Sequence, residues 1–352
     1  RDLLRLTPDD VASWNMLGRT LAETGDLAGA IAAFDNVGAI GERSGDKTLA
    51  TSALLNKGMA YRTHGEFDSA LVVLHQARML LDESSPDPIF VLCLTQFGVV
   101  HHLRGDLREA RDCYLNAIRS AQSFSEPPFG AMLALANLEY EHGRLEKARD
   151  LYRILRPIAS SKSRRAMLAG NLAGVYAALG KPRRAEALTH YALRIDRAHG
   201  NGPGAARHLQ GLANLRYEAK DFVEAERLLK EASDICHRNG DRVTLSVIYG
   251  TLAEVLLAQA VYDTRDFERA LAVAKEAASL AEAQDSVSRT ARYRITIGRT
   301  LIMMGKPQEA APLLAASAQT FSELQIPHME SLAREMLEAC ERLRSELLKL
   351  GL

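Results

Sequence analysis

Only a few short segments of the sequence combine residue types and spacings that could do chemistry. The glycine-rich segment 200–204, Gly-Asn-Gly-Pro-Gly, precedes an expected helix, where free backbone amides can bind a phosphate. It follows an expected helix rather than a strand, so we interpret it as a loop between two helices. The nucleotide-binding motif G-x4-G-K-[ST] does not occur in the sequence.

Histidine and cysteine occur without the spacing that metal sites need. His101 and His102 are adjacent, so they point to different faces of a helix, and Cys236-His237 has no partner at ligand spacing. The four cysteines form no C-x-x-C pair, which favours reduced thiols in a cytoplasmic protein. Because no residue stands in a nucleophile motif either, we expect no metal, no cofactor and no enzymatic activity.

The composition is that of an ordinary folded protein. The 352 residues include 44 Lys and Arg against 44 Asp and Glu, so the net charge of zero argues against a surface built for nucleic acid or anionic membrane. Only 6% of the residues are aromatic, and the abundance of Ala and Leu favours helix over strand. The most apolar stretch, residues 246–262, contains Gly250 and Glu254, so we expect no membrane span.

One frame of small and apolar residues recurs eight times along the chain. Each copy contains an alanine that is followed by an aromatic or aliphatic residue four positions later in most copies. The spacing between these alanines is 37 to 45 residues, and they are Ala30, Ala70, Ala110, Ala148, Ala185, Ala225, Ala270 and Ala310. A repeat of this length indicates an array of supersecondary units of the same type.

The frame predicts a hairpin of two helices. Small residues such as Gly18 and Gly58 let two helix backbones approach closely, and apolar residues at helical spacing line the contact. A glycine between the two helices fits a left-handed helix end, at Gly25, Gly65, Gly105, Gly143, Gly180 and Gly305. No segment alternates with period two, so we predict an all-α fold of eight helical hairpins.

The first copy resembles the tetratricopeptide repeat. It has the family frame W-x2-L-G-x2-Y, then G, then A-x3-F, from Trp14 to Phe34, with Leu21 in place of Tyr. Its length exceeds the usual repeat of about 34 residues. The long form is similar to the repeats of kinesin light chain, to the arrays of large bacterial regulators that carry an ATPase, and to peptide-pheromone receptors. The resemblance implies a right-handed superhelix.

Several copies depart from the family frame. Lys220 and Arg265 replace the turn glycine, and Glu139 and Arg216 replace the tyrosine between repeats. The seventh copy has about five extra residues around positions 259–263, where we expect one more helical turn or a bulged loop.

The expected organisation has three parts. Residues 1–8 resemble the tail of a truncated upstream repeat, which predicts a piece of a longer protein. Residues 9–326 contain the eight repeats. Residues 327–352 alternate apolar and charged residues at helical spacing, as a capping helix needs.

The resemblance places binding on a concave face lined by the first helix of each hairpin. Side-chain amides can pair with a peptide backbone, and Tyr and Arg are favoured binding anchors. Gly170 and Gly174 are expected to leave the floor of the central groove bare. The predicted peptide-binding residues are Asn137, Tyr140, Asn171, Arg207, Gln210, Asn214 and Tyr217 in this groove, with Arg62 and His102 in earlier repeats.

The sequence also bears on the partner. Three residues, Asn137, Asn171 and Arg207, match a carboxylate clamp found in some members of the family, whereas Leu133 and Gly211 depart from it. Residues 153–220 are strongly basic, which favours an acidic or C-terminal peptide. Nucleic acid is less favoured, because interleaved stacking aromatics are absent.

We therefore expect a non-catalytic scaffold or sensor module that binds a protein or peptide segment. By resemblance it is the regulatory region of a larger bacterial signalling or defence protein. The alternative is a self-association module that forms a homo-oligomer. A peptide-regulated phosphatase is a third possibility without a recognisable catalytic segment.

Overall fold

The computed structural model describes residues 9–84, 87–284, 286–324 and 326–349. Within these ranges the chain forms seventeen α-helices and one π-helical turn, and it forms no strand. The prediction of an all-α fold with eight helical hairpins and a C-terminal helix is confirmed. The expected tail of an upstream repeat, residues 1–8, lies outside the described residues.

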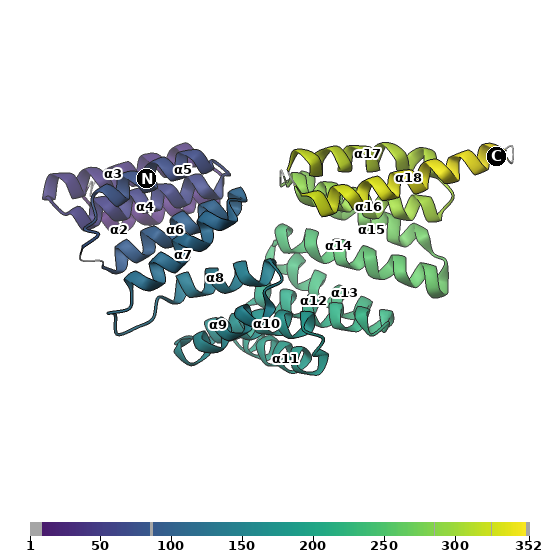
Figure 1. Cartoon of the computed structure of the whole chain (residues 1–352), viewed down its shortest axis with the longest axis horizontal. Helices are drawn as coiled ribbons and strands as arrows, with labels where there is room; N and C mark the ends of the chain where they lie inside the picture. The colour runs from purple at the N-terminus through teal and green to yellow at the C-terminus, as the bar shows by residue number, and fades with distance from the viewer. Residues whose placement is uncertain (1–8, 85–86, 285, 325, 350–352) are drawn as a thin grey trace. The chain divides into compact units, whose positions relative to one another are not determined.

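The chain divides into two compact units, residues 1–160 and 161–352. Unit 1 contains four hairpins, in which each first helix packs against the second helix that follows it (Figure 1). The pairs are α2 (Val11–Glu23) with α3 (Leu27–Ser44), α4 (Lys47–Thr63) with α5 (Phe67–Met79), α6 (Pro88–Arg104) with α7 (Leu107–Ser120), and α8 (Phe129–Glu141) with α9 (Leu145–Ile158).

Unit 2 contains four more hairpins and a terminal helix that packs on the last of them. The pairs are α10 (Lys162–Ala178) with α11 (Pro182–Ala198), α12 (Gly202–Glu218) with α13 (Phe222–Asn239), α14 (Arg242–Gln259) with α15 (Phe267–Glu282), and α16 (Val287–Met303) with α17 (Pro307–Glu323). The terminal helix is α18 (Pro327–Lys349), which begins at the residue predicted for the capping helix.

Left-handed residues end the first helices as the frame predicts. All six glycines predicted at the turns within hairpins have positive φ. Lys220 and Arg265, which replace glycine at this position, adopt the same conformation with φ of 61° and 51°. A lysine or arginine is less favourable than glycine in this conformation.

The extra residues of the seventh copy form a π-helical turn, η1 (Ala260–Thr264), which continues α14. This confirms the extra helical turn. On length and composition, residues 242–262 are apolar enough to cross a membrane, with a mean hydropathy of 1.5. However, 61% of this apolar stretch is buried within the protein, and α14 packs between α13 and α15. It is therefore a core helix of unit 2.

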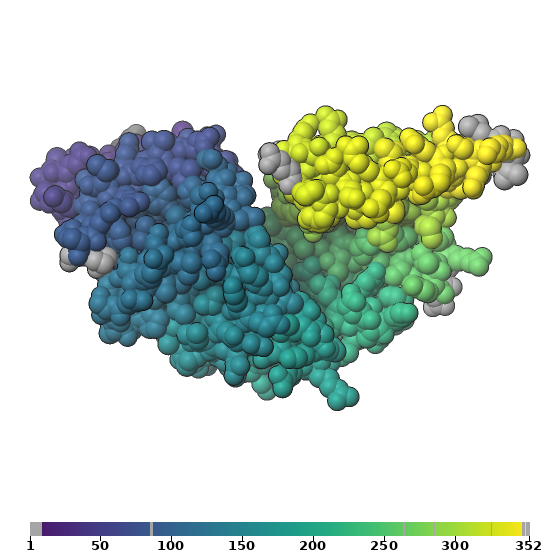
Figure 2. Space-filling model, viewed as in Figure 1, coloured from purple at the N-terminus to yellow at the C-terminus, as the bar shows by residue number. Residues whose placement is uncertain are grey.

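Small residues are buried wherever two helices cross. The eight repeat alanines are at most 1% exposed. A Cβ atom on Gly98 would overlap the ring of Tyr114, and one on Gly298 would lie 2.7 Å from Cδ2 of Leu314. On the face shown in Figure 2, the side chains of unit 1 form a continuous surface over its helices. The frame of small residues thus sets how closely the helices approach.

The first helices of each unit line its inner side. Helix α4 contacts α2 and α6, and α12 contacts α10 and α14, whereas no two consecutive second helices contact each other to a similar extent among the described residues. We call the exposed and half-exposed stripe of the first helices the inner face of a unit. For unit 1 it includes Met16, Arg19, Met59, Leu92, Gln96, Leu103 and Tyr140, and for unit 2 Met167, Arg207, Asn214, Glu254, Arg292 and Arg299.

Candidate functional site

Helix α12 presents four of the predicted binding residues on one face of the helix. Arg207, Gln210, Asn214 and Tyr217 follow one another at intervals of three, four and three residues, which places them in one stripe. Arg207 and Asn214 are exposed, and neither forms a hydrogen bond or ion pair with a described residue. Both side chains are therefore available to a ligand.

The other two residues of this stripe contact neighbouring helices of unit 2. The amide Nε2 of Gln210 donates to Oγ1 of Thr251 on α14, at 2.8 Å. The ring of Tyr217 lies 5.6 Å from that of Phe222, and burial raises the pKa of its hydroxyl. Gln210 and Tyr217 thus hold the stripe in place beside Arg207 and Asn214.

A row of polar contacts continues across α14 and α16. Glu254 accepts hydrogen bonds from Thr296 at 2.7 Å and from Arg299 at 3.0 Å. Arg292 lies on the same face of α16 and has no partner among the described residues. Of the charged residues named for the inner face of unit 2, Arg207 and Arg292 therefore have no partner among the described residues, whereas Glu254 and Arg299 pair with each other.

The expected bare floor at Gly170 is wrong. A Cβ atom at this position would overlap Cε1 of His208, so the imidazole covers the glycine. Nε2 of His208 lies 3.1 Å from Oδ2 of Asp196, which is buried, and the pKa of His208 is lowered by burial against the opposing effect of that carboxylate. Gly170 serves close packing between α10 and α12. Asn171, the next residue, is half-buried.

The remaining predicted residues lie on unit 1. Oδ1 of Asn137 accepts a hydrogen bond from the Tyr152 hydroxyl at 2.6 Å, which ties α8 to α9. Nε2 of His102 lies 2.7 Å from a carboxylate oxygen of Glu141 on the neighbouring first helix. Tyr140 is exposed. Asn137 and His102 therefore already have structural partners.

Arg62 has an unusual environment. Its Nε atom is buried and has no hydrogen-bond partner among the described residues, and burial lowers the pKa of the guanidinium. The hydroxyl of Tyr114 is likewise buried without a described partner. A ligand or a bound water would satisfy these atoms.

The nine predicted residues thus fall on two units. Four lie on unit 1 and five lie on unit 2, where four share α12. Their grouping in a single groove stays a prediction, whereas the stripe on α12 is a property of unit 2 alone.

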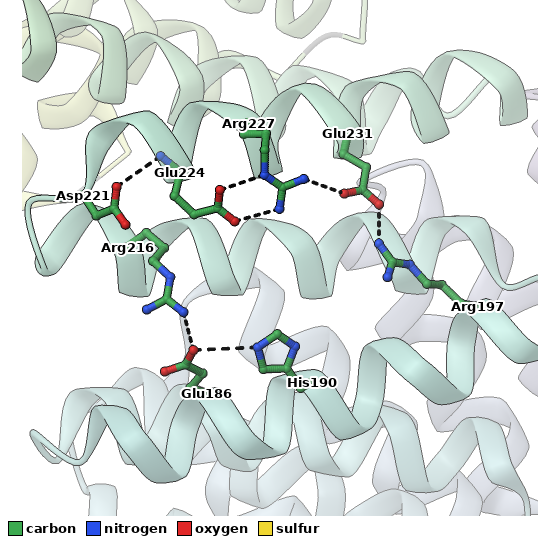
Figure 3. Close-up of polar contacts among 8 residues, drawn as sticks. All are labelled: Glu186, His190, Arg197, Arg216, Asp221, Glu224, Arg227 and Glu231. Atoms are coloured by element: carbon green, nitrogen blue, oxygen red, sulfur yellow. Dashed lines mark hydrogen bonds and ion pairs between the residues drawn. The ribbon is translucent and has the colours of Figure 1, made fainter.

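Ion pairs within unit 2 neutralise part of the basic segment. Arg197 pairs with Glu231, which also receives Arg227, and Arg216 pairs with Glu186 (Figure 3). Some of the positive charge between residues 153 and 220 is therefore neutralised by acids of the same segment or of the next hairpin.

Both residues that replace the inter-repeat tyrosine form ion pairs with the preceding second helix. Glu139 is buried and accepts from Nε of Arg111 at 2.8 Å and from Arg144. Burial alone would raise the pKa of Glu139, but these hydrogen bonds outweigh it and lower the pKa. Arg216 pairs with Glu186 at the same positions of the frame, with the charges reversed. In the sequence, the two pairs stand as opposite charges 28 and 30 residues apart, and this spacing could have predicted both contacts.

Family models for the tetratricopeptide repeat match residues 164–238 in one case, and residues 1–41 and 104–163 in another. Together they cover half of the sequence, and the hairpins described above have the geometry of this repeat. The chain belongs to the tetratricopeptide repeat family.

Solved structures of tetratricopeptide repeat proteins have the same fold. A Rap protein in complex with Competence and Sporulation Factor is 14% identical with a TM-score of 0.61, over 96% of this chain and 99% of that one. A tetratricopeptide repeat protein from Parabacteroides merdae is 17% identical with a TM-score of 0.58, over 83% and 98%.

A third similar structure is a signal transduction ATPase with numerous domains and a tetratricopeptide repeat sensor, from Pyrococcus horikoshii. It is 13% identical with a TM-score of 0.58, over 86% of this chain and 46% of that one. No curated protein sequence matches the chain. At these identities the similar structures establish the fold.

The described residues contain no group of three or more His, Cys, Asp or Glu side chains that could hold a metal ion. What the α12 stripe offers instead is a set of hydrogen-bond donors and acceptors beside an aromatic ring. Such groups can form hydrogen bonds with a polar ligand.

Proposed function

We propose that the chain is a non-catalytic module that binds a protein or peptide segment on the inner face of unit 2. The observation that carries the proposal is the pair Arg207 and Asn214, exposed on one stripe of α12 and without partners among the described residues. An arginine and an amide so placed can bind a carboxylate and a peptide group.

Charge supports an acidic or C-terminal segment as the ligand. Two arginines of this face, Arg207 and Arg292, lack a carboxylate partner among the described residues, and Arg299 is paired with Glu254. The similar Rap protein is complexed with Competence and Sporulation Factor, which supports ligand binding by this type of fold. The tetratricopeptide repeat sensor of the Pyrococcus ATPase supports a regulatory role in a larger signalling protein, which we propose for the cytoplasm.

A peptide library displayed on phage tests the proposal. We expect the full chain to enrich peptides with acidic residues or a free C-terminal carboxylate. The double variant Arg207→Ala/Asn214→Ala should lose this enrichment, because both exposed groups that pair with the ligand are removed. Retention of the same peptides by the double variant would refute the site.

Self-association is the alternative that the same preparation tests. Light scattering of the full chain should give the mass of one chain, 38.6 kDa. A stable oligomer whose assembly is lost in Arg207→Ala/Asn214→Ala would assign the inner face of unit 2 to a second copy instead.

A further inference from the structure

The outer surface of unit 1 has a cavity between two second helices. It has a volume of about 380 Å³ and lies between α5 and α7, with α6 beneath it. The floor is a stripe of α6 at helical spacing, Phe90, Leu94 and Phe97. Helices α5 and α7 have 13 and 14 residues, against 17 and 18 in α11 and α13, so they cover less of the helix beneath them.

Several polar groups with few polar partners surround this apolar floor. The guanidinium of Arg119 donates only to the Leu115 carbonyl, at 3.4 Å, and has no carboxylate partner among the described residues. Asn116 forms no hydrogen bond with a described residue, and the ring of His75 packs against that of Phe97 in a T-shaped contact, with 4.8 Å between ring centroids. The amide of Asn116 and the terminal nitrogens of Arg119 are therefore available to water or a ligand.

The second arginine of the cavity is partly neutralised. A guanidinium nitrogen of Arg78 lies 2.6 Å from a carboxylate oxygen of Glu83. The rim therefore carries one paired and one unpaired guanidinium, which gives an excess of one positive charge from these three groups. A single anionic group would balance it.

We propose that this cavity is a second binding site, for a compact carboxylate with an aromatic or branched aliphatic body. The carboxylate would accept hydrogen bonds from Arg119 and Asn116, and the apolar body would lie on the floor formed by α6. The volume falls within the range of small-molecule sites. Phe90, Leu94 and Phe97 are 4–6% exposed, so the floor is a narrow apolar strip among mostly polar lining residues. The site is separate from the inner faces, so it goes beyond the function proposed above.

A cysteine in the cavity wall provides a local reporter. Cys113 is half-buried among the lining residues, whereas Cys93, Cys236 and Cys340 are buried. Burial raises the pKa of the Cys113 thiol, so alkylation will be slow, but a ligand in the cavity should slow it further.

The experiment uses the full chain with phenylacetate as the probe. We expect phenylacetate to bind with a Kd of about 1 mM or lower, as measured by calorimetry, and to slow alkylation of Cys113 by iodoacetamide. Arg119→Gln should weaken binding by about tenfold or more, since it removes the unpaired charge. Arg108→Gln, an exposed change on the same helix without a described partner, should leave binding unchanged.

Four results would overturn the proposal. Phenylacetate that neither binds nor protects Cys113 would show that the cavity is not a site. Equal binding of the neutral alcohol 2-phenylethanol would show that the cavity does not recognise the carboxylate. An unchanged affinity in Arg119→Gln would show the same. Inorganic phosphate that binds as well as phenylacetate would show that charge alone is recognised and that the floor contributes nothing.

Discussion

Unit 1 exposes Met59 and Leu103 on its inner face, whereas the corresponding stripe of unit 2 carries Arg207, Asn214 and Arg292. The helices beneath are built on the same frame, with buried alanines at every crossing. The difference therefore lies in exposed positions that packing does not fix. Both faces are mixed, since unit 1 also carries Arg19 and Gln96 and unit 2 also carries Met167. The difference teaches that one repeat scaffold can present different mixtures of apolar and polar side chains in its two units.

The two units also differ at one equivalent contact. In unit 1, Glu139 on a first helix pairs with Arg111 on the preceding second helix, and in unit 2 Arg216 pairs with Glu186 in the reverse sense. The Glu139 side chain is only 2% exposed, whereas those of Glu186 and Arg216 are both 33% exposed. The same geometry should therefore contribute differently to stability.

The largest expected effect is that of Glu139→Ala. Loss of this buried carboxylate leaves Arg111 and Arg144 without their partner, so the free energy of unfolding should fall by about 2–3 kcal/mol. Glu186→Ala is the matched control in unit 2 and should cost less than about 1 kcal/mol, because both partners there are half exposed. Urea unfolding measures the free energy of unfolding of both variants. Equal losses in the two variants would contradict the expected difference between the units.

The next effect should be the same in both units. Ala110 and Ala185 are at most 1% exposed at equivalent crossings, so changing either to Leu should cost about 1–3 kcal/mol through overpacking. Thermal melting of the single variants measures this. A variant that melts like the wild type would mean that its crossing is not close-packed. Because repeats contact mainly their neighbours, damage should stay local and broaden the transition.

A smaller effect tests whether the reversed pair is interchangeable. Glu186→Arg or Arg216→Glu alone places like charges together and should cost about 1 kcal/mol. The double change gives unit 2 the charge order of unit 1, so its stability should return to within about 0.5 kcal/mol of the wild type. A double variant no better than the sum of the singles would show that the orientation of the pair matters.

The hairpins could be predicted from the sequence because they depend on residue types with few alternatives. A crossing needs a small residue, a left-handed turn favours glycine, and a capping helix needs one apolar face. The turns at Lys220 and Arg265 were also identifiable, since both stand where the frame expects glycine.

The candidate site could be predicted only in part. The stripe on α12 follows from helical spacing, but the sequence cannot show which polar residues pair within the protein. Gln210 contacts Thr251, and Asn137 accepts from Tyr152, each through a partner on another helix. Gly170 was misinterpreted for the same reason, because its neighbour His208 comes from the next hairpin. Contacts between repeats decide which side chains stay available.

The most direct test of the account compares the two inner faces with one acidic peptide selected from the library. Fluorescence anisotropy would give its affinity for the wild type, for Arg207→Ala/Asn214→Ala on unit 2, and for Arg19→Ala/Gln96→Ala on unit 1. These pairs are matched, because each removes an arginine and an amide without described partners. We predict a loss of about 1–3 kcal/mol of binding free energy for the unit 2 variant and none for the unit 1 variant. A loss confined to the unit 1 variant would contradict the account.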